Sequence, residues 1–188
     1  NFMVYDVKDL KFQVDLDYKI AKNITFNSSG SARYVSSDRV HEIHEGSNII
    51  GAYRADETKV VKDQNIFLYE DPRNPGSTKQ VVLNEGGILH KYSNTLLSYN
   101  FRNSLTYRGM FGETGAHELD VFVGQELRHV DRERDNYSGY GMQFDKGFVP
   151  FTDPRLIEKL ITGGEYYFGK GLEKERTVGF FGKVGYTF

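Results

Sequence analysis

Apolar and polar residues alternate with a period of two in several stretches of this chain. Leu10–Ile20 has apolar residues at its even positions and polar residues between them, and a similar pattern resumes in Ile24–Tyr34 after the short turn Ala21–Asn23. Successive side chains of a β-strand point to opposite faces of a sheet, so each stretch predicts a strand with one apolar face. Together the two stretches predict a tight hairpin.

Three more strands are predicted later in the sequence. Leu97–Arg108 and Glu118–Arg128 alternate in the same way and are separated by a short segment, which predicts a second hairpin. Val178–Phe188 predicts a fifth strand, whose apolar face ends in two aromatic residues and whose pattern is interrupted by the off-phase Phe181. The chain is therefore expected to be all-β and antiparallel.

The connections between these strands differ greatly in length. The hairpin turns are short, whereas Ser36–Thr95 and His129–Glu175 far exceed the roughly 12 to 15 residues at which a loop in a compact domain becomes unusual. Short turns on one side and long loops on the other are typical of outer-membrane β-barrels, whose strands need about 9 to 11 residues to cross a bilayer. Several tyrosines near the strand ends fit an interfacial aromatic girdle: Tyr18, Tyr34, Tyr99, Tyr107 and Tyr186.

In a transmembrane barrel the two faces of each strand would meet different surroundings. The apolar face would meet lipid, and the polar face, which carries charges at mid-strand, would meet a water-filled lumen. The residues expected to face lipid are Leu10, Phe12, Val14, Leu16, Phe101, Leu105, Val121 and Val123. Those expected to face the lumen are Arg102, Asp120, Glu126, Arg128 and Lys183.

The direction of the strands predicts the orientation of the chain. If the short turns are periplasmic, the first strand runs inward, the chain begins outside the cell, and both long loops are extracellular. A complete single-chain barrel has an even number of strands, and at least about eight. Five strands are therefore expected to be a piece of a larger barrel, with Val178–Phe188 as an internal strand.

Composition excludes several other classes of protein. The 188 residues include 20 Gly and are 14% aromatic, which favours β structure, and the absence of Cys excludes a disulfide scaffold and a thiolate metal site. With a net charge of -2 and no basic stripe, no nucleic-acid partner is expected. No apolar run approaches the roughly 18 to 20 residues of a transmembrane helix.

No catalytic, cofactor or metal site is predicted. His41 and His44 lie three apart, which is not the HExxH spacing, and on a strand their rings would point to opposite faces. His90, His117 and His129 have no serine arranged with them as a nucleophile site. We therefore expect a protein that is not an enzyme.

The predicted extracellular segments contain features of their own. Asp153–Gly164 has the capping residues and apolar spacing of a short helix, and residues 66–83 have a Pro/Gly-rich centre between apolar runs, which predicts a hairpin arm. Either could contact a partner or pack only within its loop. An aromatic group could stack on sugar rings or peptide side chains, or form a loop core: Tyr137, Tyr140, Phe144, Phe148 and Phe151.

Four segments, in this order, carry a resemblance to a known family. They are DLKFQVDLDYKIAKNITFNSSGSARYVSS, EGGILHKYSNTLLSYNFRNSLTYRGMF, HELDVFVGQELRHVDRE and GYGMQFDKGFVPFTDP. The chain resembles the SusC/RagA-type TonB-dependent transporters of Bacteroidetes. The resemblance implies that residues 1–188 form part of a 22-stranded outer-membrane barrel, without the plug domain, the TonB box or the remaining strands.

The resemblance also implies a function and partners. Members of the family import oligosaccharides or oligopeptides across the outer membrane with a SusD-like surface lipoprotein as a lid, and TonB acts through the plug. Two alternatives remain open at this point. One is a small closed outer-membrane barrel of structural or adhesive type, which would need at least three more strands from the long loops. The other is a soluble carbohydrate-binding β-sandwich, which the unequal loops disfavour.

Overall fold

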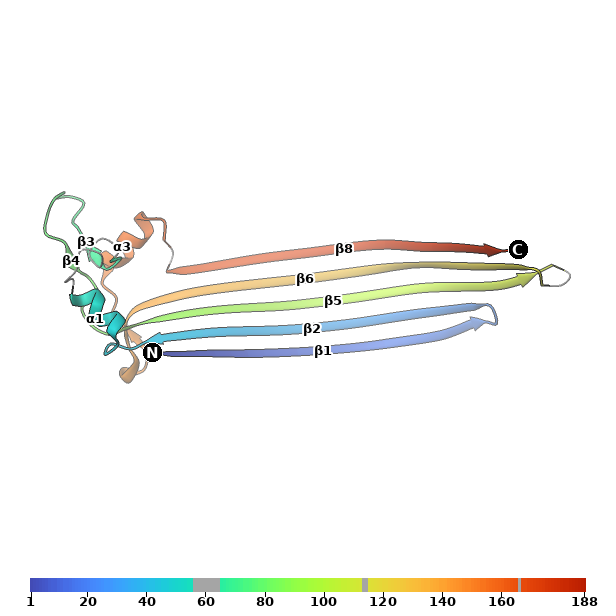
Figure 1. Cartoon of the computed structure of the whole chain (residues 1–188), viewed down its shortest axis with the longest axis horizontal. Helices are drawn as coiled ribbons and strands as arrows, with labels where there is room; N and C mark the ends of the chain where they lie inside the picture. The colour runs from blue at the N-terminus through green and yellow to red at the C-terminus, as the bar shows by residue number, and fades with distance from the viewer. Residues whose placement is uncertain (56–64, 113–114, 166) are drawn as a thin grey trace. The chain divides into compact units, whose positions relative to one another are not determined.

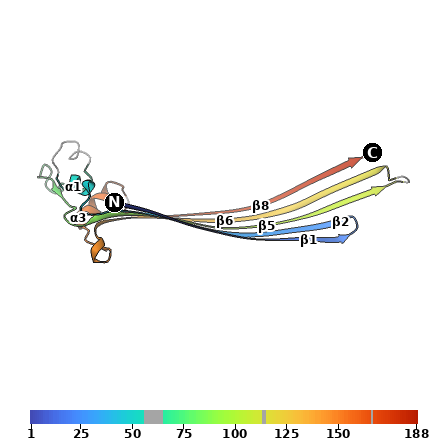
Figure 2. The same ribbon diagram turned by 60° about the horizontal axis from the view of Figure 1, so that its bottom comes forward.

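Five long strands form the main sheet in the computed structural model of this chain, which describes residues 1–55, 65–112, 115–165 and 167–188. They lie side by side in Figures 1 and 2: β1 (Phe2–Ala21), β2 (Ile24–Ile43), β5 (Gly87–Phe111), β6 (His117–Gln143) and β8 (Phe168–Thr187). The shorter elements are α1 (Asn48–Ala55), β3 (Leu68–Tyr69), β4 (Gln80–Val81), η1 (Phe144–Lys146), β7 (Val149–Pro150) and α3 (Pro154–Thr162).

The order of the strands follows the chain. The sheet runs β1-β2-β5-β6, and both β7 and β8 pair with β6. Neighbouring long strands run in opposite directions (Figure 1), so the predicted all-β antiparallel fold and its five strands are confirmed. Among the described residues, no helix is long and apolar enough to cross a membrane.

The predicted ends of the strands were wrong on the side of the long loops. β2 continues to Ile43, β5 begins at Gly87, β6 continues to Gln143 and β8 begins at Phe168. Both predicted loops are therefore shorter than Ser36–Thr95 and His129–Glu175, although part of the first, residues 56–64, lies outside the described residues. The ladder of backbone hydrogen bonds continues where the apolar and polar alternation has faded, because pairing satisfies the peptide groups whatever the side chains are.

The chain divides into two compact units. The first, here called the loop unit, contains residues 1–6, 37–94 and 134–171, and the second, the strand unit, contains residues 7–36, 95–133 and 172–188. The main buried apolar cluster belongs to the loop unit. Its members are Ile43, Ile50, Phe67, Val82, Leu83, Ile88, Tyr140, Leu156 and Leu160.

Helix α3 forms where the capping pattern predicted it. The Asp153 carboxylate accepts a hydrogen bond from the backbone N–H of Arg155 at 2.9 Å, and Pro154 occupies the first helical turn, where its missing N–H costs nothing. Leu156 and Leu160 are buried in the core of the loop unit, whereas Ile161 is 60% exposed. The apolar side of the helix thus packs within its own unit.

The predicted hairpin arm is also confirmed. Strands β3 and β4 pair antiparallel, with Leu68 opposite Val81 and Tyr69 opposite Gln80. Between them the side chain of Glu70 accepts a hydrogen bond from the backbone N–H of Gly76 at 2.6 Å. Gly76 has a φ of 89°, a left-handed conformation that glycine adopts without strain. Phe67 anchors the base of the arm because its ring is fully buried.

Candidate functional site

The apolar face of the strand unit is uncovered. The side chains of Leu10, Phe12, Val14 and Leu16 are between 54% and 69% exposed, and Phe180 is 78% exposed. Contacts in the centre of the unit show which other residues share this face. A Cβ added to Gly30 would lie 3.8 Å from the Phe101 ring, and one added to Gly182 would lie 3.7 Å from Val123. A continuous apolar face of this kind requires an apolar neighbour.

The opposite face of the strand unit carries paired polar side chains. Arg33 forms an ion pair with Asp9 at 2.6 Å. The Asn100 amide donates a hydrogen bond to Glu126 at 2.8 Å, and the Arg108 guanidinium donates one to Asp120 at 2.9 Å. Arg132 donates one to Glu173 at 3.1 Å. These pairs join successive strands, so two of the predicted lumen residues, Asp120 and Glu126, lie on one polar face.

Arg102 also lies on this polar face, together with the off-phase Phe181. The Arg102 guanidinium lies 4.6 Å from the centroid of the Phe181 ring, and this ring lies 5.6 Å from that of Phe122. Gly124 makes room for Phe181, because a side chain at Gly124 would overlap the ring. Phe181 therefore breaks the hydropathy pattern without breaking the strand.

Alternation places the last two predicted lumen residues on the same face. Arg128 follows Glu126 by two residues on β6, and Lys183 follows Phe181 by two residues on β8. Side chains two residues apart on a strand share a face. The polar set and the apolar set thus occupy opposite faces of the strand unit.

The aromatic end of β8 joins a group that the sequence did not identify. The His117 ring lies 5.7 Å from the Phe111 ring, 5.9 Å from Tyr186 and 5.1 Å from Phe188, measured between centroids. His117 Nδ1 also lies 2.6 Å from the Tyr186 hydroxyl. The two closing aromatics therefore pack with both ends of the β5–β6 connection. In the sequence, the aromatic residues near the strand ends were the feature that could have indicated this group.

The five aromatic candidates of the loop unit have different surroundings. Tyr137 and Tyr140 lie in β6 rather than in a loop, and Tyr140 is buried against Phe67 with ring centroids 5.5 Å apart. Phe144 and Phe148 contact each other edge to face at 5.4 Å, whereas Phe151 is 72% exposed. Of the two roles expected for this aromatic group, Tyr140 therefore has that of packing in the core of the loop unit.

The histidines have contacts of their own. His44 stacks on Phe144 with ring centroids 4.4 Å apart, and the His41 ring lies 6.1 Å from that of His90. His90 Nδ1 lies 2.9 Å from the Ser138 hydroxyl. Across the residues that the structure describes, no group of three or more His, Asp or Glu side chains is arranged to hold a metal ion.

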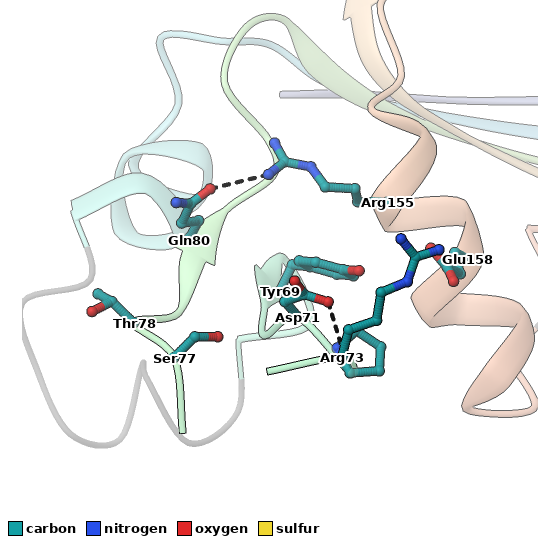
Figure 3. Close-up of a pocket in the computed structure, with 9 residues that line it drawn as sticks. Tyr69, Asp71, Arg73, Ser77, Thr78, Gln80, Arg155 and Glu158 are labelled. Atoms are coloured by element: carbon teal, nitrogen blue, oxygen red, sulfur yellow. Dashed lines mark hydrogen bonds between the residues drawn. The ribbon is translucent and has the colours of Figure 1, made fainter. Parts of the chain in front are cut away.

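A polar cavity of about 600 Å³ lies between the hairpin arm and α3 (Figure 3). The Arg155 guanidinium reaches across it, donating to the Gln80 side chain at 3.0 Å, and forms an ion pair with Asp153 at 2.7 Å. Lys159 ties the helix to the arm, because its Nζ donates to the carbonyls of Ile66 at 2.8 Å and Leu68 at 2.6 Å. The lining is Tyr69, Asp71, Pro72, Arg73, Ser77, Thr78, Gln80, Arg155 and Glu158.

The titratable groups around this cavity respond to their neighbours. Hydrogen bonds from Arg155 hold the pKa of Asp153 below its usual range, and Asp153 in turn raises the pKa of Arg155. Burial lowers the pKa of Lys159. The cavity contains both signs of charge, since its lining includes Arg73 and Arg155 as well as Asp71 and Glu158 (Figure 3). It therefore has no marked preference for an anion or a cation.

A second cavity, of about 400 Å³, lies on the strands of the loop unit and was not predicted from the sequence. Its lining includes Arg39, Tyr92, Arg134 and Asn136. The strands predicted from the sequence end before these residues, which were assigned to the two long loops. Alternation gave no clear signal here, because Val35 interrupts the polar positions of β2 between Arg33 and Arg39 and the other face carries Ser36 and Asp38.

Comparison with known proteins finds similarity of structure. No family model and no curated protein matches the sequence. The "closed-closed" structure of the RagAB peptide importer matches 99% of this chain with a TM-score of 0.60 and 14% identity. Another structure, of the RagAB peptide transporter, matches 99% with a TM-score of 0.57 and 12% identity. This chain is similar in fold to a segment of those chains. It spans 16% of the length of each.

Proposed function

We propose that this chain is a barrel segment of a SusC/RagA-like, TonB-dependent outer-membrane transporter that imports oligopeptides. The observation that carries the proposal is the strand unit, with an uncovered apolar face on one side and paired charges on the other. An apolar face of this extent suits lipid, and the polar face suits a water-filled interior. The similarity in fold to part of RagAB chains supports the same function.

The dimensions of the apolar face agree with a bilayer. On β1 this face runs from Leu10 to Ile20, and on β8 from Val178 to Phe188. Strands of about 9 to 11 residues cross a membrane at a tilt of about 45°. The aromatic group of Phe111, His117, Tyr186 and Phe188 would then lie at the periplasmic interface, where aromatic side chains are favoured.

The loop unit would lie outside the cell in this orientation. Its buried core gives the arm and α3 a fixed shape, which is what a docking surface for a SusD-like lipoprotein lid requires. TonB would act through a plug domain elsewhere in the full-length protein. The peptides named for the RagAB structures favour peptide over oligosaccharide as the imported substrate.

A soluble β-sandwich, the alternative given above, explains the exposed apolar face of the strand unit less well. A sandwich requires a second sheet that covers the apolar side of the first. In the part of the chain that the structure describes, the second sheet consists of β3 and β4, with two residues each. Both strands belong to the loop unit.

Transport by the full-length protein tests the proposal. Cells that produce it with its lipoprotein partner should accumulate labelled oligopeptides, and accumulation should stop when a protonophore removes the inner-membrane proton gradient. Cells that carry the empty vector are the control. Equal accumulation with and without the protonophore would contradict the proposed TonB-dependent transport.

A further inference from the structure

We propose that the cavity around Arg39, Tyr92 and Arg134 is a binding site for the carboxylates of acidic peptides. The inference rests on the proposed function and adds a substrate class to it. The cavity has a volume of about 400 Å³, and all its lining residues belong to the loop unit. They are Tyr5, Ser37, Arg39, Tyr92, Ser93, Asn94, Arg134, Asp135 and Asn136.

Arg39 is held in an orientation that suits a carboxylate. Its guanidinium carbon lies 4.4 Å from the centroid of the Tyr92 ring. A guanidinium that stacks on a ring keeps its N–H donors in its own plane, directed away from the ring. In that plane two parallel N–H groups can hold both oxygens of one carboxylate. The ring thus positions the cation and leaves its donor edge for a ligand.

The lining of the cavity includes more positively than negatively charged side chains. Arg39 and Arg134 supply two permanent positive charges. Asp135 also contributes to the lining, but it stands between Arg134 and Asn136 on β6, so alternation directs its side chain to the other face of the strand. Burial lowers the pKa of the neighbouring His90, and the charges of His41 and Arg39 lower it further. At neutral pH the arginines therefore provide the positive charge.

The remaining polar groups suit the backbone of a peptide. Ser37 donates a hydrogen bond to the Tyr5 hydroxyl at 3.0 Å, which orders two hydroxyls at the edge of the cavity. Asn94 and Asn136 add side-chain amides, which can both donate to and accept from peptide groups. Gly169 leaves space for the Asn136 side chain, because a Cβ at this position would overlap it.

Binding measurements on the full-length transporter test the inference. The probes are fluorescent peptides of equal length that are rich in Glu, in Lys or in Ser and Gln, with an oligogalacturonate as a non-peptide acid. The Glu-rich peptide should bind best, and its affinity should fall with added salt. Arg39→Gln and Arg134→Gln should each weaken its binding by about tenfold or more, which corresponds to the loss of one charge-assisted hydrogen bond.

Lys91→Gln is the matched control. Lys91 precedes Tyr92 on β5, is exposed, and points by alternation to the opposite face, so this variant removes the same charge from outside the cavity. It should leave the affinity for the Glu-rich peptide unchanged. The comparison of the probes on the unaltered protein stays decisive even if an arginine variant does not fold.

The other outcomes contradict either the carboxylate site, the assignment of a peptide ligand or the proposed function. Equal affinity for the Glu-rich and the Ser/Gln-rich peptides, or equal loss in Lys91→Gln, would overturn the carboxylate site and leave the importer proposal intact. Binding of oligogalacturonate without binding of the Glu-rich peptide would overturn the peptide assignment. Binding of none of the peptides would contradict both this inference and the proposed function.

Discussion

His117 Nδ1 lies 2.6 Å from the hydroxyl of Tyr186, and the two rings stack with centroids 5.9 Å apart. This contact joins the start of β6 to the end of β8. It explains why the apolar face of the last strand ends in aromatics, because their rings complete a group with His117 and Phe111. At a membrane interface such rings can bury their apolar bodies in lipid and keep their polar atoms bonded.

The first prediction concerns this hydrogen bond. Tyr186→Phe keeps the ring and removes the hydroxyl, so it should lower the free energy of unfolding by about 0.5 to 1.5 kcal/mol. Urea unfolding of the full-length protein in lipid bilayers would measure the change. In a double-mutant cycle with His117→Ala the two losses should not add, because both variants remove the same bond. Strict additivity would show that the bond contributes nothing.

The second prediction concerns the apolar face of β1. Val14→Arg should cost about 2 to 4 kcal/mol of unfolding free energy in a bilayer, since it places a charge near the centre of the lipid. Gln13→Arg is the control, because Gln13 lies on the polar face, where it donates a hydrogen bond to Asp15 at 3.0 Å. An equal cost for both variants would contradict the assignment of the two faces.

The third prediction concerns the core of the loop unit. Leu160 is 4% exposed, so Leu160→Ala should cost about 2 to 5 kcal/mol through lost burial and a cavity. Ile161→Ala, at a neighbouring position that is 60% exposed, should change stability by less than about 0.5 kcal/mol. Amide hydrogen exchange in residues 154–162 would report the difference. Similar protection in the two variants would mean that α3 is not anchored by Leu160.

The fourth prediction concerns the acid sensitivity of α3. The pKa of Asp153 is lowered from its ordinary value of 3.8 by Arg155, so its charge stabilises the folded unit above that value. This stability should be lost as the pH falls below about 3.8 through the lower folded pKa. Asp153→Asn retains an N-cap acceptor without the charge, so hydrogen exchange in α3 should lose this pH dependence. An unchanged pH profile in the variant would assign the dependence to another group.

The fifth prediction concerns the partner. Deletion of residues 71–77 removes the tip of the hairpin arm and no part of the main sheet. It should therefore reduce recovery of the SusD-like lipoprotein in a pull-down from detergent, while the barrel remains folded. Heat-dependent migration on a gel would verify the fold. Full recovery of the lipoprotein would leave the arm without a role in lid binding.

The sequence predicted those parts of the fold whose signal is local. Alternation located the strand around Leu10–Ile20, and the Asp153 and Pro154 pattern located α3, because side-chain periodicity and capping act within a few residues. The outer ends of the strands were not predictable in this way. Around Arg39 both faces carry polar residues, and the strand continues because its neighbours pair with its backbone.

The roles of single aromatic residues required the tertiary structure. Phe181 looked like an error in the apolar pattern, yet it lies over Gly124 beside Arg102 on the polar face. Tyr140 was expected either to stack on a ligand or to form a loop core, and it packs against Phe67 in the core. Both assignments depend on residues far away in the sequence, which periodicity does not connect.

The most direct test of the two-faced strand unit compares adjacent residues Phe122 and Val123 on β6. This 188-residue sequence contains no cysteine, so Phe122→Cys and Val123→Cys can each carry a single fluorescent label in the chain. The full-length protein in bilayers would be exposed to a quencher attached to the lipid tails. We expect strong quenching at position 123 and little at position 122. Quenching at position 122 as strong as at position 123 would contradict the assignment of the two faces.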